Sequence, residues 1–82
     1  MLEKGPYTEL GEALRERLAV IADRAAYEQD PAAHLKRLQS ASERIDRAAA
    51  TLPAPVPGDL AHFLKGSSYQ KALAWLEHHS MV

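Results

Sequence analysis

His62 belongs to the one group of residues in this sequence whose types and spacing could carry out chemistry. Lys65 and Gly66 follow it at the third and fourth positions. Residues with this spacing share one face of a helix, so the three would lie together if a single helix carries them. A neutral imidazole is a competent nucleophile near neutral pH, and an ammonium group stabilises the charge that the imidazole gains. The spacing therefore suits a nucleophilic histidine with a cation beside it.

The segment from 61 to 68, Ala-His-Phe-Leu-Lys-Gly-Ser-Ser, resembles the phosphoacceptor signature of histidine phosphotransfer domains, the four-helix-bundle relays of bacterial two-component signalling. The resemblance implies that His62 accepts a phosphoryl group from the aspartate of a receiver domain. It also implies that Lys65 steadies the phosphoryl oxygens and that Gly66 leaves room for the partner. The match covers eight of the 82 residues, and the family carries its histidine on a long, unbroken helix.

The same residues also fit the end of one short helix and the start of another. Gly66 suits the left-handed conformation that commonly follows a helix. Ser67 and Gln70 have the spacing of a capping box, in which Ser67 is the N-cap of the next helix. On this interpretation Lys65 is a cation in a last helical turn and His62 is an ordinary surface or interface histidine. We favour it and keep His62 as the alternative phosphoacceptor.

The other histidines and the acidic residues predict neither a metal site nor an active site. His78 and His79 are adjacent, so their side chains point to different sides of a helix and cannot easily hold one ion. Three acidic residues with helical spacing are expected to form a solvated helix face: Glu9, Glu12 and Glu16. The sequence offers no Glu-x-x-His pair, no Gly-rich phosphate loop and no Ser-His-Asp arrangement. We expect a protein that is not an enzyme and needs no cofactor.

Length and composition indicate one globular domain, residues 1–82, with 46% hydrophobic and 26% charged residues. The net charge of -1 gives no electrostatic reason to expect a nucleic acid or an anionic membrane as a partner. No apolar run approaches the ~20 residues of a membrane span. The first residues lack the basic and apolar regions of a signal peptide, so a cytoplasmic location is expected.

Two long helices, from about 8 to 28 and from about 31 to 52, are predicted to form an antiparallel hairpin. Asp30 and Pro31 mark the start of the second helix, and Pro53 marks its end. The apolar stripe of the first helix comprises Leu10, Leu14, Leu18, Ile21 and Ala25. The predicted seam of the second comprises Leu35, Leu38, Ser42, Ile45, Ala49 and Leu52. Only Gln29 and Asp30 separate the two predicted helices, and so short a connection makes them antiparallel neighbours.

Two short helices, about 59–65 and 68–78, are predicted to pack on the hairpin and complete a small helical bundle. A Pro-rich connector, residues 53–58, leads to them, and Asp59 is expected to cap the first. Residues 1–6 are expected to be a flexible lead. Because the hairpin alone is too thin to bury both apolar stripes, these helices or a second copy of the chain must cover it.

The sequence therefore predicts an all-α interaction or self-association module, with a protein partner or a homodimer as its complex. Its contact surface is expected on the open side of the hairpin together with the aromatic residues Phe63, Tyr69 and Trp75. Phosphotransfer through His62 is the alternative function.

Overall fold

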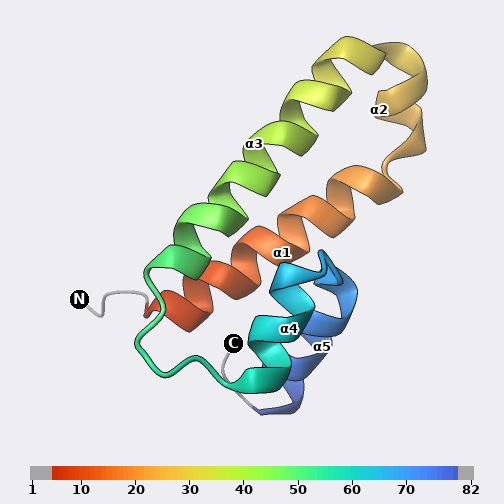
Figure 1. Ribbon diagram of the computed structural model, residues 1–82. Helices are drawn as coiled ribbons and strands as arrows, with labels where there is room; N and C mark the ends of the chain where they lie inside the picture. The colour runs from red at the N-terminus through yellow and green to blue at the C-terminus, as the bar shows by residue number, and fades with distance from the viewer. Residues whose placement is uncertain (1–4, 80–82) are drawn as a thin grey trace.

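Five helices and no strand make up residues 5–79, the part of the chain that the computed structural model describes (Figure 1). The helices are α1 (Pro6–Ala22), α2 (Arg24–Gln29), α3 (Pro31–Ala50), α4 (Gly58–Lys65) and α5 (Tyr69–His78). The predicted all-α bundle is confirmed. None of these helices combines the length and the apolar character needed to cross a bilayer.

The long helices α1 and α3 pack against each other as the predicted hairpin, but the first helix is interrupted near the tip (Figure 1). A continuous helix over 8–28 was wrong, because Asp23 breaks it. The Asp23 amide donates to the carbonyl of Val20, and its carboxylate accepts from the amide of Ala26 at 3.1 Å. Asp23 thus ends α1 and caps α2, as a short acidic side chain does at a helix N-terminus. The short helix α2 forms the tip.

The predicted start of the second long helix is confirmed. The Asp30 carboxylate accepts from the amide of Ala33 at 3.1 Å, and Pro31 occupies the first helical position. The helix ends at Ala50, where the Thr51 hydroxyl donates to the carbonyl of Ala48 at 2.8 Å. It therefore ends before Pro53 is reached. At the other end of the hairpin, α1 begins at Pro6, inside the predicted lead; residues 1–4 of that lead lie outside the described residues.

The contact between α1 and α3 uses smaller residues than predicted. Ala41, Ile45 and Ala48 are the buried residues of α3, whereas Leu35 is 54% exposed. The four other predicted seam residues of this stretch are half-buried: Leu38, Ser42, Ala49 and Leu52. Alanine side chains allow helix axes to approach closely, so the alanine row becomes the seam and the leucines move to its edge.

One helix ends and another begins between Lys65 and Tyr69, as in the interpretation favoured from the sequence. The residues that end the first helix and cap the second differ from those predicted. Ser67, not Gly66, has the left-handed backbone, with a φ of 58°. The Ser68 amide donates to the carbonyl of Phe63 and the Ser67 amide to that of Leu64, the paired bonds of a Schellman motif. Ser68 is the N-cap of α5 and makes no side-chain capping bond, so the predicted capping box is absent.

The start of α4 also differs from the prediction. Pro57 is its N-cap and Gly58 its first residue, so Asp59 lies in the first turn rather than at the cap. An acidic side chain in a first turn still interacts favourably with the positive end of the helix dipole. The connector before α4 is held at Leu52 and Val56, which pack against the core.

The core lies where α4 and α5 meet α1 and the second part of α3 (Figure 1). Its largest fully buried side chains are Leu10, Leu14, Ile45, Leu60 and Leu76. Fully burying such a side chain stabilises the fold by roughly 1.5–3 kcal/mol. We call this end of the molecule the basal half. The remainder of the hairpin, residues 18–40, is the distal half, and α4 and α5 do not extend over its tip (Figure 1).

Candidate functional site

The predicted phosphoacceptor residues lie in the last turn of α4 and in the turn that follows. His62 and Lys65 are exposed on this helix of eight residues, and Gly66 is its C-cap. Phosphotransfer through His62 would require a helix that continues through Lys65, Gly66 and Ser67, but α4 ends at Lys65. The His62 ring lies 6.2 Å from that of Phe63, in a tilted arrangement. The phosphotransfer role of His62 stays a prediction.

We expect no phosphoryl group on this chain after incubation with a phosphorylated receiver domain. The reason is that the Schellman turn interrupts the helix surface on which a receiver would dock. Phosphorylation is measured by label retention under basic and acidic conditions. An acid-labile, base-stable phosphoryl group that disappears in His62→Gln, but persists in the control His78→Gln, would instead establish the phosphotransfer function.

The three aromatic residues predicted to bind a partner are partly buried and pack against the core. The guanidinium of Arg17 lies 4.7 Å from the centre of the Tyr69 ring, a cation–π arrangement. Trp75 stacks on His79 with ring centres 3.9 Å apart, and the carbonyl of Trp75 accepts from His79 Nδ1 at 2.8 Å. Phe63 is likewise half-buried. All three rings take part in holding α4 and α5 in place, and their partner-binding role stays a prediction.

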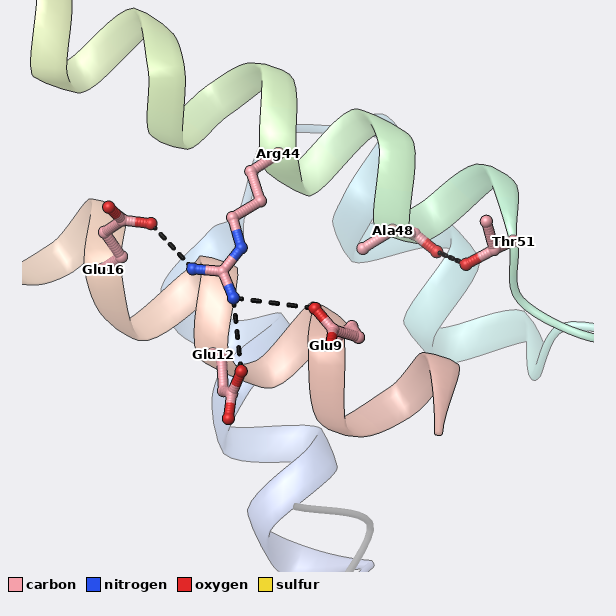
Figure 2. A network of polar contacts seen from close by, with 6 residues as sticks. All are labelled: Glu9, Glu12, Glu16, Arg44, Ala48 and Thr51. Atoms are coloured by element: carbon pink, nitrogen blue, oxygen red, sulfur yellow. Dashed lines mark hydrogen bonds and ion pairs between the residues drawn. The ribbon is translucent and has the colours of Figure 1, made fainter. Parts of the chain in front are cut away.

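The acidic residues of α1 form an ion cluster with one arginine of α3 (Figure 2). Arg44 Nη1 donates to Glu16 at 2.9 Å, and Arg44 Nη2 lies 3.2 Å from Glu12 and 3.6 Å from Glu9. The hydrogen bond to Glu16 raises the pKa of Arg44 most; desolvation opposes it and the negative charges add to it. These glutamates lie on a solvated helix face as expected, with side chains 32–48% exposed, and that face also pairs with Arg44, which the sequence did not predict.

Arg44→Leu is expected to lower the free energy of unfolding by about 1 kcal/mol, because the cluster is solvent-exposed and three carboxylates lose their shared cation. The loss should shrink at high salt, which screens exposed charges. Since the pKa of Arg44 is raised, its contribution is complete below its unfolded-state pKa and disappears only in strongly alkaline solution. Urea denaturation of Arg44→Leu and of the control Lys36→Leu tests this, and equal losses would contradict it.

The large apolar side chains that the described structure leaves exposed all lie in the distal half. Ile21 is 47% exposed, Tyr27 56% and Leu35 54%. Tyr27 makes an edge contact with the ring of His34, with centres 5.5 Å apart. The His34 Nε2 in turn lies 2.7 Å from the carbonyl of Val20, and this contact ties α3 to the end of α1.

Helical spacing places the exposed leucine and isoleucine on the side of the hairpin that carries α5. Ile21 follows the buried Leu14 by seven residues, so both lie on one side of α1. Leu35 precedes Ser42 by seven residues, and Ser42 accepts from Arg17 Nε at 3.3 Å, beside the Tyr69 ring of α5. The half-buried residues between them are Leu18 and Leu38. We call the surface formed by Leu18, Ile21, Leu35 and Leu38 the distal face.

Sequence reasoning included all four residues of the distal face but assigned them to the packed stripes of the hairpin. The lengths of α4 and α5 could have distinguished these four residues from the core residues. Helices of eight and ten residues extend only about 12–15 Å at 1.5 Å per residue. A hairpin helix of 20 residues is about twice as long. The short pair therefore cannot cover the whole apolar stripe.

Within residues 5–79 no three histidine, cysteine, aspartate or glutamate side chains are gathered so that they could hold a metal ion. No protein-family model, curated protein or solved structure matches the chain. The distal face is therefore judged on its geometry alone. It is an uncovered apolar surface continuous with a packed core, and such a surface has the properties of a contact site for another protein.

Proposed function

We propose that this protein is a non-enzymatic helical interaction module that binds another polypeptide through the distal face. The observation that carries the proposal is the exposure of Ile21 and Leu35, which are 47% and 54% accessible to solvent. Ile21 continues the stripe of the buried residues Leu10 and Leu14, and Leu35 continues the stripe that contains the buried Ile45. Removing such side chains from water on binding is favourable by about 25 cal/mol per Å².

Apart from Val20, the distal half has no buried residue and contributes little to the stability of the fold, so a role in recognition explains its composition better. The helix α2 has no buried residue, and the buried residues of α3 begin only at Ala41. Polar residues at Ile21 and Leu35 would leave the core intact and would suit water better. Their apolar character is therefore accounted for by contact with a partner.

The proposal shifts the predicted contact surface along the hairpin. The open side of the hairpin remains part of it, while Phe63, Tyr69 and Trp75 serve chiefly to attach α4 and α5. A protein partner, a cytoplasmic location and independence from cofactors complete the proposed function. The protein partner is supported by the apolar character of the distal face.

A photo-crosslinking residue placed at Leu35 tests this function. A benzophenone side chain at that position, in cells that produce the protein, should give a discrete adduct with one protein. The same side chain at Ala74, an exposed position on α5, is the matched control. The expected result is an adduct at Leu35 that is absent at Ala74. If neither position gives an adduct, or both give the same adducts, the distal face is not a specific contact site.

A further inference from the structure

The chain exposes more surface than a compact protein of its mass. Its accessible surface is 5722 Å², whereas a folded monomer of 9.0 kDa exposes about 4,850 Å². The radius of gyration, 13.4 Å, likewise exceeds the roughly 12 Å of a compact domain of this length. Ile21, Tyr27 and Leu35, the exposed large apolar side chains of residues 5–79, all belong to the distal half.

The charges of the distal half are balanced and so match those of a second copy. Residues 18–40 carry three acidic and three basic side chains, and Asp23 and Arg37 already form a pair at 3.7 Å. A strongly acidic or strongly basic partner would find no complementary potential here. Two copies of this surface would meet without net repulsion, as the self-complementary interface of a twofold dimer requires.

The shape of the distal half favours an antiparallel arrangement of two copies. It is a layer one helix thick and two helices wide, and two such layers stacked face to face form a four-helix bundle. The uncovered part of α3, from Pro31 to Ser40, has no buried residue and is about 15 Å long. The turn between α4 and α5 bounds it, because Leu18 lies with Ser67, Ser68 and Lys71 around one surface hollow.

In this arrangement the tip of one copy reaches the α4–α5 turn of the other, and their charges are opposite. Glu28 is an exposed acidic residue of the tip helix α2. Lys65 and Lys71 are exposed at the two sides of the α4–α5 turn. Parallel stacking would instead place each tip beside the other tip, and would place Lys65 and Lys71 beside the same lysines of the other copy, where like charges repel. Opposite charges at the rim of an interface fix register more than they add affinity.

We infer that the distal face binds a second copy of this chain, in an antiparallel homodimer whose central four-helix bundle is built from the two distal halves. This inference rests on the proposed function, since it names the partner of the same surface. Leu35 and Leu38 lie near the middle of the uncovered stretch of α3 and so close to the twofold axis. Each dimer covers both distal faces at once, which closes the assembly at two chains.

Sedimentation equilibrium of the purified chain tests the stoichiometry, and substitutions on the exposed positions test the surface. Wild type should form dimers, with a melting temperature that rises with concentration. Leu35→Glu should raise the dissociation constant by at least about tenfold, whereas Ala74→Glu, the same change at an exposed α5 position, should leave it unchanged. A wild-type chain that stays monomeric, or a dimer equally stable in Leu35→Glu, overturns the inference.

Two further variants test the arrangement. The chain contains no cysteine, so Leu35→Cys should form a covalent dimer on mild oxidation, faster than Ala74→Cys. Lys71→Glu should weaken association several-fold, and adding Glu28→Lys should restore it, because the pair would again have opposite charges. Rescue supports the antiparallel register. A dimer in which the double variant is as weak as the sum of the single changes overturns it.

The outcomes separate this inference from the proposed function. A monomeric purified chain that still gives a crosslinked adduct from position 35 in cells means that the partner is another protein; the interaction function then stands and the homodimer does not. A monomer without an adduct removes both. An adduct with twice the mass of the chain, formed in cells and by the purified protein alike, supports both.

Discussion

Leu76→Asp is expected to unfold the protein. Leu76 is fully buried in the last turn of α5, within the cluster that joins this helix to α1, α3 and α4. An unpaired charge at such a site costs on the order of 3–5 kcal/mol. The complete free energy of unfolding of 82 residues is about 4–12 kcal/mol at 0.05–0.15 kcal/mol per residue. The substitution therefore removes a large part of the stability, or all of it.

Circular dichroism and urea denaturation measure this loss, and Ala74→Asp is its control. Ala74 lies two residues earlier on the same helix and is exposed, so the same new carboxylate there should change the free energy of unfolding by no more than about 0.5 kcal/mol. A Leu76→Asp protein with wild-type helix content and an unchanged urea midpoint would show that α5 is not packed as described.

Leu14→Ala should lower the free energy of unfolding by about 3 kcal/mol, because it leaves a cavity in the centre of the core. Leu14 has no exposed surface and belongs to the cluster with Leu60 and Leu76. The same substitution at Leu35, which is 54% exposed, should change the stability of the single chain by less than about 0.5 kcal/mol. The pair compares one leucine in the basal half with one in the distal half.

Urea midpoints at protein concentrations too low for association provide the comparison, with hydrogen exchange as an independent measurement. Amides of α1 near Leu14 should exchange only on global unfolding. Those of α2, which has no buried residue, should exchange through local opening. Similar losses at the two leucines would mean that the hairpin is evenly packed along its length, contrary to the burial observed.

The sequence predicted those elements of the fold that depend on local signals. Asp30 followed by Pro31 marks a helix start that needs no tertiary information, and the structure confirms it. The break at Asp23 carries neither proline nor glycine and so could not be distinguished from an ordinary polar position in a helix. Ser67 shows a related limit, because glycine one residue earlier was the better candidate for a left-handed conformation.

The residues of the candidate site could not be predicted from the pattern of any single helix, because they depend on how the helices lie relative to one another. Arg44 gathers three glutamates only because the antiparallel register places it opposite the middle of them. Leu35 was predicted as a seam residue since its spacing matches that of Ile45, and it became exposed because α4 and α5 are too short to reach it. The Arg44 cluster and the exposure of Leu35 both depend on how far one helix extends along another. The spacing of apolar residues within a helix does not contain this information.

The absence of fully buried side chains between residues 21 and 40 separates the residues that fold this protein from those that would recognise a partner. Core positions change slowly in any lineage, because most substitutions there reduce stability below what folding requires. Positions such as Ile21 and Leu35 have no such restriction from the fold. The tip could therefore acquire a new specificity through a few substitutions while the basal half stays the same, and it could be redesigned in the laboratory in the same way.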